Sequence, residues 1–399
     1  MLKYIHRMLI IGEKNMDIMQ ESLALHKKLN GKIEIKNKYK INDMHDMTLV
    51  YTPGVAKACL TIHENPEEVY TLTSKKNTVA VISDGTAVLG LGDIGPLAAI
   101  PVMEGKCALF KRFGGVDAIP IVLNTKDVDE LVNTIYHLSP SFGGINLEDI
   151  SAPRCFEVEK RLKELCDIPV FHDDQHGTAI VVGAALLNAL KLVGKKLSQV
   201  RIVINGAGSA GIAITKFLLE LGAKHIVTCD KFGMITEGDE QLNFAQKEIS
   251  LVTNRKKIKG NLADALKGTD VFIGVSAGNI VSEEMITSMN TDSIVFPLAN
   301  PTPEISRDKA LHAGARVVGT GASNLPNQIN NSLVFPGIFK GALESRAKQI
   351  TPQMEVAACK ALASIVKKEE LKETYIIPSI FNKKVARSVS KAVVKITRQ

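Results

Sequence analysis

The stretch Arg201-Ile202-Val203-Ile204-Asn205-Gly206-Ala207-Gly208-Ser209-Ala210-Gly211 decides the fold of the second half of this chain. Residues 201–205 are β-branched and apolar, as in a buried strand, and residues 212–221 have the apolar spacing of an amphipathic helix. Gly206 permits a tight turn, Gly208 lets the backbone approach a pyrophosphate, and Gly211 allows the helix to pack against the strand. Ser209 and Ala210 complete the loop, where the helix N-terminus faces the phosphates. The stretch therefore predicts a Rossmann-type, doubly wound dinucleotide-binding domain.

A second predicted strand, residues 225–229, ends at Asp230, where an acid is expected to meet the adenosine ribose. A carboxylate there would accept a hydrogen bond from the 2′-hydroxyl group and repel a 2′-phosphate, which favours NAD over NADP. Lys231 follows directly and weakens this preference, so NADP stays an alternative. A strand–turn–helix unit without any nucleotide is the structural alternative for the whole motif.

Two acidic pairs lie upstream, each directly after an apolar run. Glu148 and Asp149 follow residues 144–147, and Asp173 and Asp174 follow residues 168–171. The intervening residues have helical periodicity, so we expect a βαβ unit that gathers all four carboxylates at the carboxyl ends of neighbouring parallel strands. Crowded carboxylates repel one another, and oxygen ligands favour Mg²⁺ or Mn²⁺ over zinc or copper. The sequence predicts a hard-metal site, although ordinary polar strand ends would explain either pair alone.

Two histidines beside the second acidic pair suggest zinc as a different metal. His172 and His176 are four residues apart, as in some zinc sites, but Gly177 interrupts the pattern and no third soft ligand lies nearby. We therefore expect no zinc.

The composition is that of an α/β chain with two cores. Of 399 residues, 45% are hydrophobic and 23% charged. The net charge of +7 comes mainly from both ends, but no aromatic interleaving or groove-reading motif accompanies it, so we expect no nucleic-acid partner. The longest apolar run, residues 179–192, falls short of the ~20 residues of a membrane span, and we expect a buried helix and no membrane insertion.

Cysteine usage and the first residues bear on the compartment. The six cysteines show no CxxC pair or regular spacing, which indicates a reducing environment and mostly buried thiols. Residues 1–12 lack the long apolar region and cleavage site of a secretory signal, and they carry too few arginines and serines for a typical mitochondrial presequence. We expect a cytoplasmic protein.

The remaining elements place the domain boundaries. We expect helices at residues 16–29 and 177–192, a loop at 47–55, and further strands at the ranges 79–82, 118–123, 270–275, 293–296 and 316–318. After a polar break near Lys195, the Rossmann-type half begins. The fold class is thus an N-terminal α/β substrate and metal domain (residues 1–194), a nucleotide-binding domain (195–345), and C-terminal helices (346–399) that could pack back on the first domain.

These segments together resemble the malic enzyme family, in its short form without an appended acyltransferase domain. The resemblance covers about residues 45–345 and rests on a series of motifs in the family's order. The motifs are Tyr51-Thr52-Pro53-Gly54-Val55-Ala56, Ser83-Asp84-Gly85 with Leu89-Gly90-Leu91-Gly92-Asp93-Ile94-Gly95, Gly105-Lys106, Leu147-Glu148-Asp149, Phe171-His172-Asp173-Asp174-Gln175-His176-Gly177-Thr178-Ala179, the glycine loop, Ala299-Asn300-Pro301-Thr302, and Asn330-Asn331 before Phe335-Pro336-Gly337.

The resemblance implies oxidative decarboxylation of L-malate to pyruvate and CO₂, with reduction of NAD or NADP at a divalent metal site. It assigns Lys106 as the base that takes the C2 hydroxyl proton and Tyr51 as the acid that protonates C3. It also implies that family members form homodimers or larger homo-oligomers, in which Tyr51 could act across a subunit interface. The residues carried over are Tyr51, Lys106 and Asp173 as catalytic residues, Glu148, Asp149 and Asp174 as metal ligands, and Asn300 and Asn330 as contacts of the substrate carboxylate or the nicotinamide ribose.

One position departs from the family pattern. Larger animal and plant members have an arginine shortly after the Asp-Gly turn that holds the malate carboxylate, whereas Thr86-Ala87-Val88 follows Gly85 here. The anion clamp must therefore differ. Two other functions stay open: a metal-independent dehydrogenase of a hydroxy or amino acid with Lys106 as base, and a dinucleotide-binding sensor without turnover.

Overall fold

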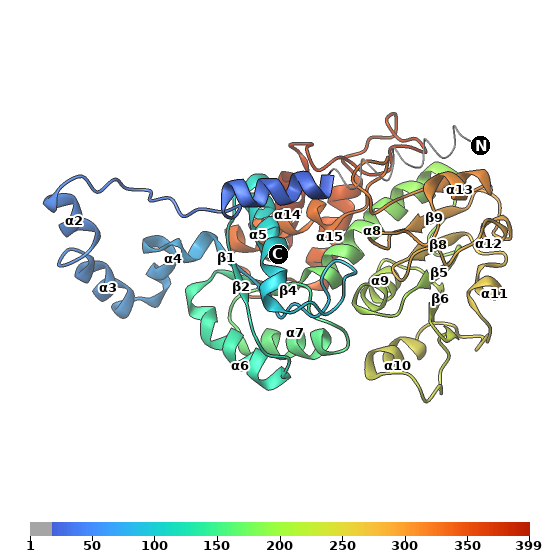
Figure 1. Cartoon of the computed structure of the whole chain (residues 1–399), viewed down its shortest axis with the longest axis horizontal. Helices are drawn as coiled ribbons and strands as arrows, with labels where there is room; N and C mark the ends of the chain where they lie inside the picture. Colours follow the sequence, from blue (N-terminus) through green and yellow to red (C-terminus); the bar gives the residue numbers. More distant parts are fainter. Residues whose placement is uncertain (1–17) are drawn as a thin grey trace.

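Two parallel sheets form the framework of the computed structural model, which describes residues 18–399 (Figure 1). The first sheet has four strands in the order β2-β1-β3-β4, and the second has six in the order β10-β9-β8-β5-β6-β7. Neighbouring strands pair in parallel, except that β7 pairs antiparallel with β6. The expected α/β class with a Rossmann-type second half is confirmed. The targeting segments considered at residues 1–12 lie outside the described residues.

The element bounds are as follows. The strands are β1 (Thr78–Ser83), β2 (Asp117–Val122), β3 (Gly144–Leu147), β4 (Val170–His172), β5 (Arg201–Asn205), β6 (His225–Asp230), β7 (Gly233–Met234), β8 (Val271–Gly274), β9 (Ile294–Pro297) and β10 (Val317–Val318). After a helix over residues 18–29, the helices are α2 (Met44–Val50), α3 (Val55–Glu64), α4 (Val69–Leu72), α5 (Pro96–Leu109), α6 (Val128–Leu138), α7 (Arg154–Leu165), α8 (Asp173–Val193), α9 (Ser209–Glu220), α10 (Phe244–Ser250), α11 (Leu262–Leu266), α12 (Glu283–Thr287), α13 (Arg307–His312), α14 (Phe335–Ser345), α15 (Pro352–Ala363) and α16 (Val385–Thr397). Short helical turns are η1 (Pro66–Glu68), η2 (Ser74–Asn77), the π-helical η3 (Phe110–Gly114), η4 (Ser139–Ser141) and η5 (Asn331–Leu333).

The structure corrects two local expectations. The loop expected at residues 47–55 is wrong, because α2 runs to Val50 and α3 begins at Val55. Asp43 begins α2 by accepting a hydrogen bond from the backbone N–H of Asp46 at 2.8 Å, a cap that the apolar pattern did not show. The helix expected from Gly177 starts at Asp173, directly after β4, so the second acidic pair forms its first turn.

Helix α8 joins the two halves of the molecule. A single cluster of buried apolar residues contains Val79 and Phe171 from the first sheet, Ile180 from α8, and Ile204 and Phe217 from the second half. By length and composition α8 could cross a membrane, but 67% of its most apolar window is buried inside the protein. As expected for this apolar run, α8 is a core helix, and it fixes the first sheet relative to the second.

Helix α14, at the end of the range expected for the nucleotide-binding domain, packs on the first half of the chain. The ring centres of Phe335 and Phe339 on α14 lie 4.6 and 5.4 Å from that of Phe110. Phe339 also packs edge-on against Phe171 of β4, at 5.8 Å between ring centres. Since Phe171 lies two residues before the acidic turn of α8, α14 supports the end of the strand that carries this turn.

An N-terminal arm leaves the body of the protein. Figure 1 shows α2 and α3 projecting away from both sheets. None of the residues in α2, α3 or α4 is buried. The arm carries large exposed apolar side chains, among them Ile35, Met44, Tyr51 and Leu60.

The aromatic contact between α14 and β4 can be tested by truncation. We expect Phe339→Ala to cost about 3–5 kcal/mol of unfolding free energy, because it leaves a cavity among fully buried rings. Denaturant unfolding followed by circular dichroism measures the loss. The control is Phe381→Ala, whose side chain is 74% exposed. Equal losses in the two variants would show that α14 does not depend on this contact.

Candidate active site

A buried lysine lies at the centre of the carboxyl edge of the first sheet. Lys106 on α5 is 7% exposed, and its Nζ lies 2.7 Å from Glu148 Oε1. The same ammonium contacts the carboxylate of Asp173 and lies 4.1 Å above the ring centre of Phe335. Lys106 therefore links the end of β3 to the first turn of α8, and its ammonium packs on the Phe335 ring of α14.

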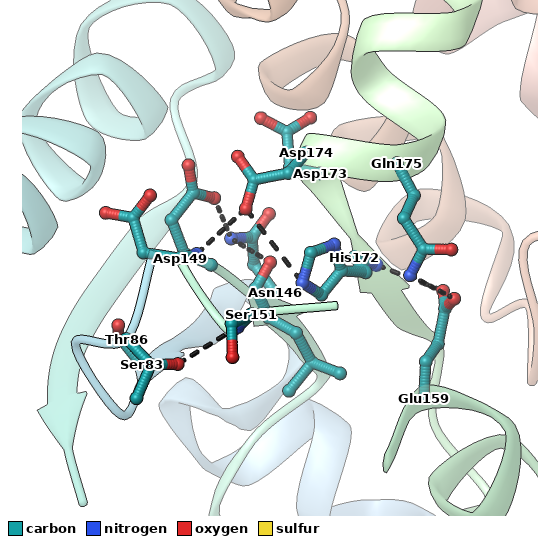
Figure 2. Close-up of polar contacts among 12 residues, drawn as sticks. Ser83, Thr86, Asn146, Asp149, Ser151, Glu159, His172, Asp173, Asp174 and Gln175 are labelled. Atoms are coloured by element: carbon teal, nitrogen blue, oxygen red, sulfur yellow. Dashed lines mark hydrogen bonds and ion pairs between the residues drawn. The ribbon is translucent and has the colours of Figure 1, made fainter. Parts of the chain in front are cut away.

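Three of the four predicted carboxylates form a compact cluster beside this lysine. Carboxylate oxygens of Glu148, Asp149 and Asp174 lie within 4.8 Å of one another. The backbone N–H of Asp149 donates to Asp174 Oδ2 at 2.8 Å, which ties the two acidic turns together (Figure 2). Asp149 has a positive φ of 54°, a conformation that Asp tolerates better than most residues and that turns the chain at the end of β3.

The carboxylates strongly influence one another's charge. Burial raises the pKa of Asp149 to about 9, and repulsion from Asp174 and Glu148 adds to the effect. Burial also raises the pKa of Asp173 to about 8, although attraction to Lys106 opposes this. For Lys106, burial lowers the pKa, but attraction to the surrounding carboxylates outweighs it and raises the pKa above the ordinary lysine value. One ammonium thus faces four carboxyl groups, and their full ionisation would leave the site with excess negative charge.

These residues fit a hard divalent cation. Asp149 Oδ2 is buried without a hydrogen-bond partner among the described residues, so it has a lone pair free for a ligand. The donor set is made of carboxylate oxygens, which Mg²⁺ and Mn²⁺ prefer. Both ring nitrogens of His176 face carboxylates, Glu159 at 2.9 Å and Glu355 at 3.0 Å, so this side chain is engaged away from the cluster.

Gly177, which follows the first turn of α8, has no room for a side chain. A Cβ on Gly177 would lie 1.8 Å from Asp173 Oδ1 and 3.2 Å from the Cβ of Asn331. Gly177 therefore makes space for the Asp173 carboxylate, and the segment with Asn330 packs on the same turn. Asn330 accepts a hydrogen bond from the backbone N–H of Ser332 at 2.9 Å, which begins η5.

The glycine loop has the geometry that its sequence suggested. Gly206 has φ +111°, and a Cβ there would lie 2.4 Å from the carbonyl oxygen of Val275. A Cβ on Gly211 would lie 1.6 Å from the carbonyl oxygen of Gly206, so α9 approaches β5 too closely for any side chain. Gly208 is exposed at the start of α9, with open space where a side chain would be, and Ser209 and Ala210 form the first turn of that helix.

Asp230 lies at the end of β6 and is fixed by two donors. Its Oδ1 accepts from the backbone N–H of Phe232 at 2.8 Å, and its Oδ2 from Gln246 Nε2 at 3.4 Å. Gln246 also donates to the carbonyl oxygen of Ala207 at 3.4 Å and so joins Asp230 to the glycine loop. The ammonium of Lys231 lies over the ring of Phe232, 4.9 Å from its centre.

Asn300 lies where the two halves of the chain meet. A Cβ on Gly90 would come within 2.3 Å of the backbone oxygen of Asn300, so the Leu89–Gly92 loop of the first half touches the Asn300 loop of the second. Glu304 holds that loop by accepting from the backbone N–H groups of Ser276 and Ala299 at 2.8 and 3.1 Å. Asn300 is exposed, and its amide therefore lies at the surface where the two halves of the chain meet.

Of the three predicted catalytic residues, Tyr51 is the one that lies away from the carboxylate cluster of its own chain. It ends α2 on the projecting arm and is 69% exposed. Arg154 does not replace the arginine that is missing after Gly85, because the Arg154 guanidinium group already has partners within the protein. It pairs with Asp84 Oδ2 at 2.8 Å and donates to Thr86 Oγ1 at 2.9 Å. Neither side chain offers a free clamp for a substrate anion within one protomer.

Several residues around the site were assigned no role from the sequence. Asn146 donates to Glu148 Oε2 at 2.9 Å, and His172 is fully buried with neither ring nitrogen hydrogen-bonded among the described residues. Burial lowers the pKa of His172 to about 4, so the ring is neutral. Gln246 and Glu304 each hold a loop that is distant along the chain, at Asp230 and at Ser276, which spacing alone does not reveal.

A Rossmann-type sheet with a glycine loop, joined to a buried lysine–carboxylate centre, defines a nucleotide-dependent oxidoreductase. The family model for "Malic enzyme, N-terminal domain" matches residues 30–163, and that for "Malic enzyme, NAD binding domain" matches residues 175–398. The chain belongs to the malic enzyme family.

Individual relatives agree with this assignment. A "NAD-dependent malic enzyme" of Geobacillus stearothermophilus is 54% identical over 386 residues, covering 97% of this chain and 80% of the relative. A "Bifunctional malic/malolactic enzyme" of Bacillus subtilis is 54% identical over 381 residues, covering 95% and 93%. The crystal structure of an NAD-dependent malic enzyme from Thermotoga maritima superposes with a TM-score of 0.90 at 49% identity, covering 93% of this chain and 98% of that one. Relatives named NADP-dependent malic enzymes match at lower identity.

Metal binding at the carboxylate cluster should depend on pH. The pKa of Asp149 in the folded protein, about 9, lies above its ordinary value, so the stability that this group contributes is complete at low pH and is lost as pH rises through 9. A cation needs the deprotonated form. We therefore expect Mn²⁺ to raise the melting temperature more at about pH 8.5 than at about pH 6.

Differential scanning fluorimetry with Mn²⁺ or with EDTA measures this difference at each pH. Asp174→Asn is the matched variant and should lose most of the metal-dependent increase. An increase independent of pH, or one that the variant retains in full, would contradict the cluster as a metal site.

Proposed function

We propose that this protein catalyses the oxidative decarboxylation of L-malate to pyruvate and CO₂, with reduction of NAD and dependence on Mg²⁺ or Mn²⁺. The observation that carries this proposal is the buried Lys106 ammonium between Glu148 and Asp173, beside a cluster of oxygen ligands. A buried lysine among carboxylates is a typical acid–base group of an active site. Membership of the malic enzyme family supports the substrate class.

The reaction requires proton, hydride and carbon–carbon bond chemistry in one site. The C2 hydroxyl group loses a proton while C2 gives up a hydride; the bond from C3 to the C4 carboxyl group then breaks, and CO₂ leaves. The electron pair stays on the C2–C3 unit until C3 is protonated. NAD, when bound, supplies the hydride acceptor, and a divalent cation held by Glu148, Asp149 and Asp174 supplies Lewis-acid stabilisation of negative charge on the C2 oxygen.

Lys106 and Asp173 are suited to the first proton transfer. Lys106 must lose a proton before it can accept one from the hydroxyl group, and the contacting carboxylate of Asp173 can receive it. The raised pKa of Asp173, about 8, makes its ionised form a stronger base than an ordinary aspartate, so this form can retain the proton that it receives. Its Oδ1 is buried without a hydrogen-bond partner among the described residues, which leaves an acceptor position.

Asn300 and Asn330 would bind the substrate carboxylate or the nicotinamide ribose. Amides offer donors and acceptors without adding charge, which suits a site already rich in carboxylates. The exposed Asn300 amide at the seam of the two halves, and the packing of the Asn330 segment on α8, support these roles.

The nucleotide is NAD in this proposal, with the loop of Gly206, Gly208 and Gly211 on the pyrophosphate. Asp230 would accept a hydrogen bond from the 2′-hydroxyl group of the ribose and repel the phosphate of NADP. The position of Lys231 over the Phe232 ring supports this choice, because its charge is directed to the aromatic face.

The working unit in this proposal is a homodimer, or a larger assembly built from it. The projecting arm exposes apolar side chains that a second copy of the chain would cover. Tyr51 on this arm would then reach the Lys106 centre of the partner and protonate C3. We assign residues 1–194 to malate and metal binding and residues 195–345 to nucleotide binding, with residues 346–399 as helices that brace both.

A spectrophotometric assay tests the reaction. We expect L-malate to drive NADH formation and CO₂ release with Mn²⁺ or Mg²⁺, loss of both with EDTA, and slower reduction of NADP. Full activity after exhaustive chelation, without CO₂, would indicate a metal-independent dehydrogenase. Binding of NAD without any turnover would indicate a sensor.

Mixing inactive variants tests the role of Tyr51 across the interface. Tyr51→Phe and Lys106→Ala should each lower kcat by roughly 10²- to 10⁴-fold, because each removes an acid–base group. If Tyr51 acts in the partner's site, a mixed dimer contains one intact site, and a statistical mixture should recover about a quarter of wild-type activity. No recovery after subunit exchange, verified by native mass spectrometry, would place both residues in one protomer.

A further inference from the structure

A buried glutamate outside the cluster holds the turn that carries Asp173 and Asp174. The Glu159 side chain on α7 is 6% exposed, so its charge needs partners inside the protein. One oxygen accepts from the backbone N–H of His172 at 3.1 Å, and the other from Gln175 Nε2 at 3.2 Å (Figure 2). His176 Nε2 and Lys163 Nζ each lie 2.9 Å from the same carboxylate.

The partners of Glu159 are arranged around the acidic pair. His172 precedes Asp173 and Asp174 in the sequence, and Gln175 follows them. Figure 2 shows Glu159 on the opposite side of this turn from Asp149. Glu159 thus fixes the backbone on one side of the pair and a side chain on the other, while Asp174 is directed to Asp149 and Asp173 contacts Lys106.

Helix α8 needs this support because its own start is incomplete. His172, the residue at its N-cap, makes no side-chain capping hydrogen bond. A carboxylate near the first turn of a helix is favourable because the unpaired N–H groups there carry partial positive charge. The first turn already contains Asp173 and Asp174, and Glu159 adds a further carboxylate from α7 that accepts from the backbone N–H of His172 at the N-cap.

We propose that Glu159 is a positioning residue: it holds the turn between β4 and α8 so that Asp174 meets Glu148 and Asp149 while Asp173 meets Lys106. This inference rests on the metal-dependent function proposed above. Glu159 itself touches neither Lys106 nor the cluster residues in the contacts described, so it acts through the backbone it holds.

Glu355 provides a matched contrast. It lies on α15, and its carboxylate is 3.0 Å from His176 Nδ1, on the other side of the same imidazole ring. Glu159 and Glu355 therefore share one partner, but Glu159 alone of the two also binds the His172 amide and Gln175. Removing either charge disturbs His176, whereas only the loss of Glu159 releases the acidic turn.

The test compares Glu159→Gln, Glu355→Gln and Glu157→Gln in the full-length protein. Glu157 is a half-exposed neighbour on α7 that pairs with Arg161 and serves as the surface control. Electron paramagnetic resonance measures the Kd for Mn²⁺, and fluorescence titration measures NAD affinity. Amide hydrogen exchange of His172 in the metal-free protein reports on the turn directly, and steady-state kinetics give kcat and KM for malate.

We expect Glu159→Gln to weaken Mn²⁺ binding by about 10- to 100-fold, as for other residues that orient metal ligands, with NAD affinity within about twofold of wild type. Exchange at His172 should accelerate, and kcat should stay reduced at saturating Mn²⁺. Glu355→Gln should lower the melting temperature but change the Kd for Mn²⁺ much less. Glu157→Gln should match wild type in every readout.

Wild-type Mn²⁺ affinity in Glu159→Gln, or an equal loss in Glu355→Gln, would overturn the positioning role. If Glu159→Gln does not fold, Glu159→Asp serves instead, because it keeps the charge but is one methylene too short to reach both partners. Unchanged Mn²⁺ affinity in that variant would also overturn the role. A wild-type protein that takes up no Mn²⁺ would instead refute the proposed metal-dependent function itself.

Discussion

The crowding of four buried carboxyl groups at the carboxyl edge of the first sheet is the constraint on which the rest of the structure depends. Glu148, Asp149, Asp173 and Asp174 share a single buried ammonium, that of Lys106. Carboxylates held this closely raise one another's pKa and would separate if their backbones were free to move. Two parallel strands, the start of a core helix and the Phe335 ring hold these side chains in place.

The fold connects this charged edge to the nucleotide half through α8. This helix begins with the acidic pair and ends at the polar break before β5, and its apolar length belongs to one cluster with both sheets. A substrate held at its first turn is therefore placed relative to the glycine loop by packing rather than by a flexible linker. Helix α14 reinforces the arrangement, because it packs its phenylalanines against β4 and Lys106.

The sequence predicted the chemistry of the site better than its supports. The acidic pairs, the glycine loop and Asp230 were recognisable because each closes a strand, and a strand end has a fixed place at the edge of a parallel sheet. Glu159, Gln246 and Glu304 were not recognised, since each acts on a loop far from it in sequence or across a helix–helix gap. The loop expected at residues 47–55 was wrong, because the side-chain cap at Asp43 left no mark in the apolar pattern.

The sequence by itself determined the α/β class, the order of the two halves and the residue types of a hard-metal and dinucleotide centre. These features depend on local periodicity and on the residues at strand ends, both of which are visible in a linear sequence. The tertiary structure decided which charges meet. It directed Lys106 to both Glu148 and Asp173, placed Glu159 behind the acidic turn, and left Tyr51 on an exposed arm away from the centre of its own chain. These outcomes depend on how helices from distant segments pack against the sheet, and a linear pattern does not encode that geometry.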